Sequence, residues 1–103
     1  MNITIISGSA RTNNNTIRVG KAIERLHAGD TVNLVDFISY DIPLLASGDI
    51  NPDALTPFQS QLIKAMFEAD VIYIITPEYN WSTTPEILNW LHRFGERQFK
   101  HLF

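Results

Sequence analysis

The sequence has 103 residues, of which 45% are hydrophobic and 18% charged, and it contains no cysteine. It is long and apolar enough to form one domain with a buried core, and it lacks a disulfide framework, a signal peptide and an apolar run of roughly 18 residues that would span a membrane. The net charge of −3 disfavours bulk binding of nucleic acid, so we expect a soluble, cytoplasmic domain.

The first elements are a strand and an amphipathic helix. Residues 3–6 form a β-branched apolar run that predicts a buried strand, and a polar loop over residues 10–16 follows it. Asn14 or Asn15 can cap the helix, and Gly29 can end it in a left-handed conformation. The residues predicted to face inward share one helical face: Val19, Ala22, Ile23 and Leu26.

The remaining elements continue this alternation. Residues 31–36 and 71–75 predict two further strands, and the second of these lacks polar alternation, which predicts cover on both faces. Residues 37–56 are rich in turn formers and predict a long surface loop. Pro57 begins a helix whose inward side chains are Phe58, Leu62, Ala65, Met66 and Ala69. A last helix begins at about Pro85, with Ile87, Leu88, Leu91 and Phe94 inward.

The order β-α-β-α-β-α implies right-handed crossovers and a parallel sheet. Ligands of such sheets bind beside the carboxyl ends of the strands. Residues 7–16 and 76–84 follow the first and third strands, so both loops are expected at that edge.

The first loop has the features of an anion site. A helix start offers unpaired N–H groups and a partial positive charge, and phosphate binds there readily. Gly8 allows a tight turn, Arg11 supplies a charged fork, and short donors come from Ser9, Asn14 and Thr16. Residues 1–23 carry three basic side chains and no acidic one, whereas residues 24–90 have a net charge of −8. The alternative is that the asparagines form turns and caps and that the basic residues are solvated.

The second loop combines aromatic and polar side chains. Tyr79 and Trp81 suit a flat heterocycle held by backbone amides, or they cover the core of a capped loop. Glu78 has no visible acid–base partner, so we assign no catalytic side chain. His27, His92 and His101 match no metal spacing, and the first two are expected to be exposed helix residues.

Together the two loops resemble the NADPH-dependent FMN reductase family. Its first loop reads Gly-Ser-(Leu/Ile)-Arg-x-x-Ser-x-(Asn/Thr), and this chain has Gly8, Ser9, Arg11 and Thr16 in register, with Asn14 at the second serine. Its second loop reads Pro-Glu-Tyr-Asn-Gly-Ser, and this chain has Pro77, Glu78, Tyr79, Asn80 and Ser82, with Trp81 in place of the glycine. Asn89 fits the asparagine of the helix that follows.

The resemblance implies FMN as cofactor and NADPH or NADH as electron donor. By resemblance the FMN phosphate lies against Ser9, Arg11, Asn14, Asn15 and Thr16. The isoalloxazine lies against Pro77, Glu78, Tyr79, Asn80 and Ser82, and the indole of Trp81 covers the flavin or narrows the opening. Hydride passes from NAD(P)H to flavin N5, and the electrons continue to a quinone, an azo dye, a metal oxyanion or free flavin.

The resemblance also implies a flavodoxin-like α/β fold. Such sheets have five parallel strands in the order 2-1-3-4-5, whereas this chain supplies three, in the order 2-1-3, with helices on both faces. We therefore interpret residues 1–103 as the N-terminal portion of such a domain, lacking the last strands of the usual five. Residues 71–75 would be an exposed apolar edge, which favours a fragment, a truncated product or a homo-oligomer that borrows strands. The small-molecule acceptor is the other expected partner, with no nucleic acid or membrane.

A non-enzymatic flavin carrier and an oligomerising scaffold without cofactor remain as alternatives. The carrier would bind FMN but show negligible turnover of NAD(P)H. The scaffold would self-associate without flavin.

Overall fold

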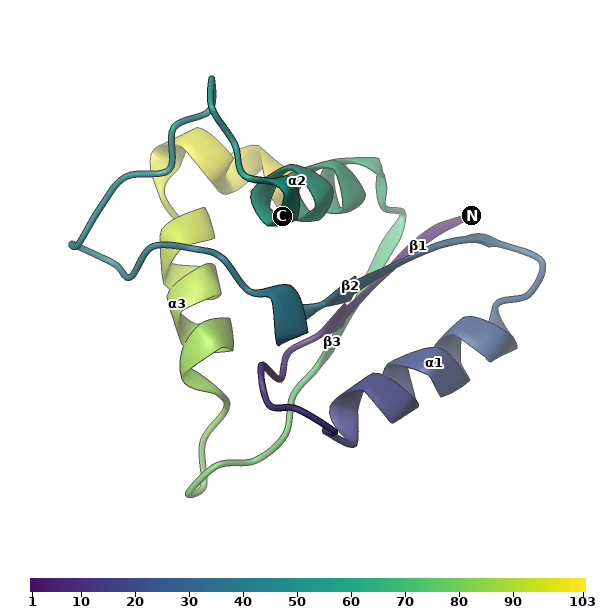
Figure 1. Ribbon diagram of the computed structural model, residues 1–103. Coiled ribbons are helices and arrows are strands. Elements are labelled where there is room, and N and C mark those ends of the chain that lie inside the picture. The colour runs from purple at the N-terminus through teal and green to yellow at the C-terminus, as the bar shows by residue number, and fades with distance from the viewer.

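The computed structural model describes residues 1–103 as a three-stranded parallel sheet with helices on both faces (Figure 1). The strand order is β2-β1-β3, which confirms the predicted flavodoxin-like α/β architecture. Register runs from Asn2↔Thr31 to Ser7↔Asp36 on one side of β1 and from Ile3↔Val71 to Ser7↔Ile75 on the other. The elements are β1 (Asn2–Ser7), α1 (Thr16–Leu26), β2 (Thr31–Asp36), η1 (Phe37–Ser39), α2 (Pro57–Glu68), β3 (Val71–Ile75), α3 (Pro85–Phe94) and η2 (Arg97–Leu102).

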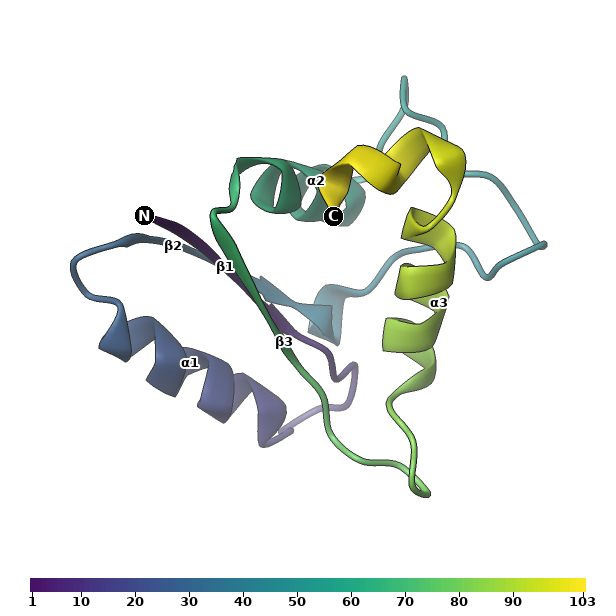
Figure 2. The same ribbon diagram turned by 180° about the vertical axis from the view of Figure 1, so that it is seen from behind.

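The two faces of the sheet carry unequal layers (Figures 1 and 2). Helix α1 lies alone on one face, where Gly20 comes close to Leu34, Ile5 and Ile75. Helices α2 and α3 and the short helix η2 cover the other face. There the buried Thr4 hydroxyl donates to the carbonyl of Ala65 in α2 over 2.6 Å.

The main hydrophobic core lies on the α2–α3 face. Phe37 is fully buried at its centre and makes edge-on contacts with Phe58 and Trp90. Phe99 stacks on Phe94 with ring centroids 4.7 Å apart, so η2 folds back onto α3. Phe99 and Leu102 are both buried, so the final residues close this side of the core.

The single helix on the other face explains why the predicted inward face of α1 is partly wrong. Val19 is 48% exposed and Leu26 is 83% exposed, whereas Thr16 and Gly20 are buried. No second helix packs beside α1, so only the narrow strip that touches the sheet is covered. The predicted inward face of α3 is also partly wrong, because Leu88 and Leu91 are exposed and Asn89, Trp90 and Arg93 are buried instead.

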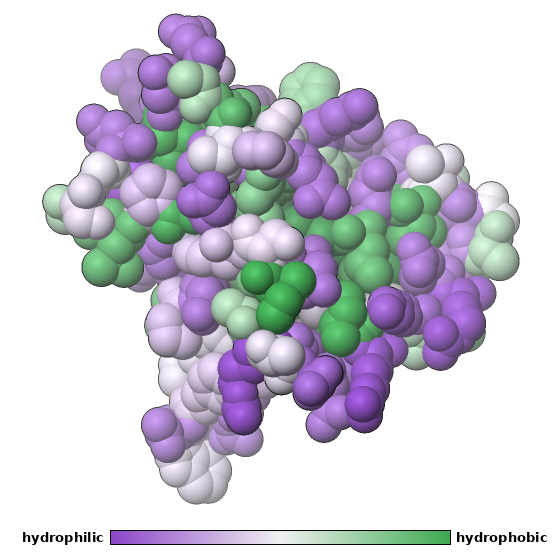
Figure 3. Space-filling model, in the orientation of Figure 1, coloured by the Kyte–Doolittle hydropathy of each residue, from purple (hydrophilic) through white to green (hydrophobic).

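Strand β3 is an edge strand, and the prediction that it is covered on both faces is wrong. Tyr73 is 36% exposed and Ile74 is 45% exposed, which confirms the expected exposed apolar edge. In Figure 2, β3 crosses in front of β1 with no strand beyond it. Figure 3 shows the opposite side of the molecule, where apolar side chains are visible in the middle of the face with polar ones around them.

The segment after β2 is more than a surface loop. Phe37, Ile42 and Ile50 are buried, so parts of residues 37–56 belong to the core. Asn89 anchors this segment, because its side chain accepts from the amide of Leu45 over 2.8 Å and donates to the hydroxyl of Tyr40 over 2.7 Å. Burial raises the pKa of Tyr40 above its ordinary value.

The helix ends follow capping chemistry with one exception. Asn14 caps α1 by accepting from the amide of Ile17 over 2.8 Å, and Thr56 forms a capping box with Gln59 at α2. Gly29 is not left-handed, because α1 already ends at Leu26.

No helix of the chain combines the length and the apolar content needed to cross a bilayer.

His27 is not the exposed helix residue that the sequence predicts. It follows α1 as the C-cap, with Nδ1 3.0 Å from Asp30 Oδ2 and Nε2 3.1 Å from the hydroxyl of Tyr73. The hydrogen bond with His27 lowers the pKa of the Asp30 carboxyl, and the α-amino group of Met1 acts in the same direction. His92 is exposed, as predicted.

The unequal cover of the two faces predicts unequal costs of truncation. We expect Leu62→Ala in α2 to lower the free energy of unfolding by about 2–5 kcal/mol, because its side chain is fully buried. Leu26→Ala in α1 should change it by less than about 0.5 kcal/mol. Urea denaturation of both variants measures the difference. A loss above about 1.5 kcal/mol for Leu26→Ala would show that this face of α1 is covered in solution.

Candidate functional site

Gly8 joins the two loops at the carboxyl edge of the sheet. Its N–H donates to the carbonyl of Ile75 over 2.9 Å, and its carbonyl accepts from the hydroxyl of Thr84 over 2.8 Å. A Cβ on Gly8 would lie 2.1 Å from Cδ1 of Ile87 and 2.9 Å from the carbonyl oxygen of Ile75. Glycine is therefore needed here because there is no space for a side chain, and not because the backbone is left-handed.

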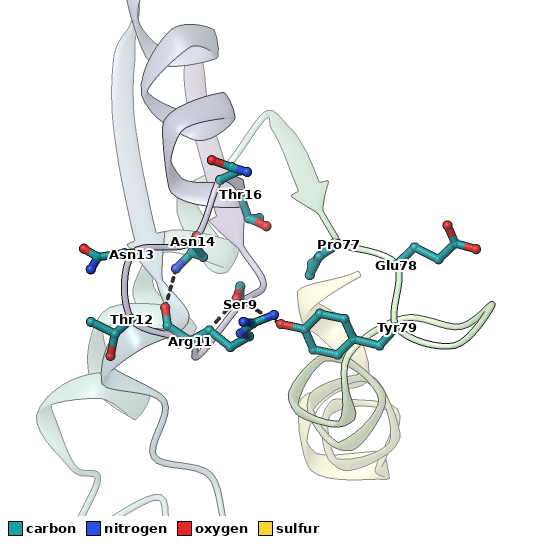
Figure 4. Close-up of a pocket in the computed structure, with 10 residues that line it drawn as sticks. Ser9, Arg11, Thr12, Asn13, Asn14, Thr16, Pro77, Glu78 and Tyr79 are labelled. Atoms are coloured by element: carbon teal, nitrogen blue, oxygen red, sulfur yellow. Dashed lines mark hydrogen bonds between the residues drawn. The ribbon is translucent and has the colours of Figure 1, made fainter.

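Beyond Gly8 the two loops separate and form the walls of a cleft of about 330 Å³ (Figure 4). We call residues 8–16, which connect β1 to the first residue of α1, loop 1. Residues 76–84, between β3 and α3, are loop 2. The residues that line the cleft come from both walls: Ser9, Arg11, Thr12, Asn13, Asn14, Asn15, Thr16, Pro77, Glu78 and Tyr79.

Loop 1 is held by its own side chains. The buried Ser9 hydroxyl accepts from the amide of Arg11 over 3.3 Å, and the Asn14 side chain donates to the carbonyl of Arg11 over 2.7 Å. Asn13 takes a left-handed conformation with φ of 54°, which asparagine tolerates better than most residues. The backbone amides of residues 12–16 donate no hydrogen bond within the chain. These free donors and the start of α1 make loop 1 a suitable anion cradle.

Arg11 supplies the positive charge at the cleft, and this charge is unpaired. Arg11 forms no salt bridge, and its guanidinium lies 6.0 Å from the ring centroid of Tyr79. In Figure 4 the carboxylate of Glu78 points away from Arg11. The hydroxyls of Ser9 and Tyr79 lie 3.5 Å apart and bridge the two walls. Arg11 is therefore free to bind an anionic group at loop 1.

Loop 2 contains a tight turn beyond the cleft. Tyr79 and Ser82 exchange two backbone hydrogen bonds of 2.8 and 3.0 Å, and between them Asn80 and Trp81 have φ of 50° and 68°. This is the pattern of a type I′ turn, in which Asn-Gly is preferred. Trp81 therefore occupies a position that favours glycine, and its side chain is 95% exposed.

Most of the predicted site residues lie together. The structure brings Ser9, Arg11, Asn14, Asn15, Thr16, Pro77, Glu78 and Tyr79 to one cleft, whereas Asn80, Trp81 and Ser82 do not line it. Sequence reasoning missed Thr12 and Asn13, although they lie between predicted residues of the same loop. It also missed Thr84, and no sequence signal marks its contact with Gly8. No cluster of three or more histidine, aspartate or glutamate side chains is arranged to hold a metal ion.

Comparison with known proteins decides the family. The family model for NADPH-dependent FMN reductase matches residues 1–102. The chain belongs to the NADPH-dependent FMN reductase family. No curated protein gives a significant match. The family match agrees with the strand order and with the place of the cleft at the carboxyl edge.

The cleft fits the cofactor after which the family is named. FMN carries an anionic phosphate at one end and a flat ring at the other. Loop 1 offers free amides and an unpaired guanidinium, and loop 2 offers the ring of Tyr79 and the apolar face of Pro77. Gly8 leaves room for both walls to approach closely. The residues of this family member therefore match both ends of FMN.

The turn geometry predicts that Trp81→Gly stabilises the protein. A left-handed conformation costs a non-glycine residue roughly 1–2 kcal/mol, partly offset by the greater freedom of glycine in the unfolded chain. We expect a gain of about 0.5–1 kcal/mol in the free energy of unfolding, measured by urea denaturation.

Asn80→Gly is the matched control, because asparagine already tolerates this conformation and the gain should be close to zero. Destabilisation by Trp81→Gly would show instead that the indole makes a stabilising contact in solution.

Proposed function

We propose that this chain is an FMN-dependent NAD(P)H oxidoreductase that delivers electrons to a small acceptor, namely a quinone, an azo compound, free flavin or a metal oxyanion. The cleft carries this proposal, because it sets an anion cradle on loop 1 opposite the aromatic wall of loop 2. The family match supports the general activity. The choice of acceptor, the preference for NADPH or NADH and the cytoplasmic location stay predictions.

In this proposal the protein binds and orients the cofactor. Ser9, Arg11 and the amides of residues 12–16 hold the phosphate, and Pro77 to Tyr79 hold the ring. FMN held there would supply the redox chemistry, namely hydride transfer from NAD(P)H and electron transfer to the acceptor. We assign no side chain of the cleft as an acid or base in this proposal.

The direct test is the visible absorption spectrum of the purified chain, with its solution mass. We expect a yellow protein, or one that takes up FMN at micromolar concentration, and oxidation of NAD(P)H when a quinone or dye is added. A colourless protein that gains no FMN under these conditions contradicts the proposal. A yellow protein without turnover would indicate a flavin carrier.

The phosphate assignment predicts a selective effect of Arg11→Ala. A charged hydrogen bond contributes about 1.5–3 kcal/mol, so FMN affinity should fall roughly ten- to hundredfold while riboflavin, which lacks the phosphate, is almost unaffected. Flavin fluorescence titration of both ligands measures the ratio.

Arg25→Ala in the last turn of α1 is the control, because it removes the same charge away from the cleft. Equal loss of FMN and riboflavin in Arg11→Ala would show that Arg11 does not meet the phosphate.

A second candidate function is an oligomerising module, and the exposed edge of β3 favours it. The strand presents Ile74 and Tyr73 to solvent and carries no lysine or proline to block pairing. In this alternative a second copy pairs along β3, with or without flavin. Sedimentation at several concentrations tests it, and a monomer at every concentration removes it.

A further inference from the structure

Loop 2 is anchored at both ends to the same residue. Its beginning is fixed where the N–H of Gly8 donates to the carbonyl of Ile75, the last residue of β3. Its end is fixed where the Thr84 hydroxyl donates to the carbonyl of Gly8. Gly8 is also the first residue of loop 1. The separation of the two cleft walls is therefore set at one residue, through its N–H on one side and its carbonyl on the other.

Thr84 is built into this junction. Its side chain is fully buried, and its hydroxyl both donates to Gly8 over 2.8 Å and accepts from the amide of Ile87 over 3.1 Å. One hydroxyl thus caps α3 and ties α3 to loop 1, 76 residues earlier in the chain. The other side-chain link between the walls, from Ser9 to Tyr79, is longer at 3.5 Å.

We propose that Thr84 is a positioning residue that holds loop 2 at the distance from loop 1 that FMN requires. This inference rests on the proposed function, because it concerns the same cleft. Thr84 does not line the cleft and touches no ligand in this proposal. It acts through the carbonyl of Gly8 and the start of α3.

The physical basis is that FMN must contact both walls at once. Its phosphate binds loop 1 and its ring binds loop 2. Once one end is bound, the other end binds favourably only if the two walls are held at the matching distance. A ligand that contacts one wall alone has no such requirement. Inorganic phosphate meets only loop 1, and lumiflavin, the ring without the ribityl phosphate chain, meets only loop 2. Loss of the Thr84 bond should therefore weaken FMN and spare both fragments.

The experiment compares three variants of the full chain. Thr84→Val keeps the shape of the side chain and removes the hydroxyl, whereas Thr84→Ser keeps the hydroxyl. Thr4→Val is the matched control, because Thr4 is equally buried and its hydroxyl donates to a carbonyl, that of Ala65, on the α2 side away from the cleft. Affinities for FMN, lumiflavin and phosphate are measured, together with hydrogen–deuterium exchange of residues 7–16 and 76–84 without ligand.

In Thr84→Val the dissociation constant of FMN should rise roughly tenfold, while those of lumiflavin and phosphate change by less than about twofold. Exchange of the hydrogen-bonded amides in the two loops, those of Gly8, Arg11, Tyr79 and Ser82, should become faster. Thr84→Ser should behave as the unmodified chain, and Thr4→Val should lose stability without these effects. Equal weakening of all three ligands, or an effect of Thr4→Val that matches that of Thr84→Val, overturns the inference.

The exchange measurement separates this inference from the proposed function. If the unmodified chain takes up no FMN, the proposed function fails, and the exchange data alone decide the role of Thr84. Faster exchange of residues 7–16 in Thr84→Val but not in Thr4→Val then supports the positioning role. Unchanged exchange overturns it.

Discussion

The packing of Gly8 is the constraint on which the cleft depends. A Cβ at this position would lie so close to Ile87 and to the backbone of Ile75 that no side chain fits. Both polar groups of its backbone are hydrogen bonded, one to β3 and one to Thr84. Parallel pairing of β1 with β3 brings the two loops to the same edge, and Gly8 fixes how close they are. A larger residue here would have to displace the Ile87 side chain and the backbone at the end of β3.

The strand order that makes the cleft also leaves apolar surface uncovered. β1 is central and its residues from Ile3 onward are buried, whereas β3 has a partner on one side only. Helix α1 lies alone on its face, which leaves Val19 and Leu26 in solvent. Exposed apolar side chains therefore remain on β3, at Tyr73 and Ile74, as well as on α1. Any strand or helix that packed there would find free backbone groups along β3 and apolar side chains beside it.

The fold was predictable where the pattern is local. Strands and helices follow from apolar periodicity, and their alternation implies a parallel sheet. The buried faces of the helices could not be predicted, because burial depends on how many elements pack against each face of the sheet. A helical pattern cannot show that α1 has no neighbour, so Leu26 looked internal. Phe37 and Ile50 looked like loop residues, because turn formers surround them and their partners lie in α2 and α3. Gly29 could end a helix, but α1 ends earlier, at Leu26.

The cleft itself was predictable because both loops follow strands at one edge, but its dimensions were not. Thr84 is separated from Gly8 by 76 residues, and a threonine before a helix reads only as a cap. The chemistry of the two cleft walls also differs. In a chain with a net charge of −3, loop 1 offers an unpaired Arg11 and free amides, while loop 2 offers an aromatic ring and an apolar proline. In the proposed function such a pair of walls would select ligands by length, because a ligand must carry its anionic end at a fixed distance from its flat end to contact both.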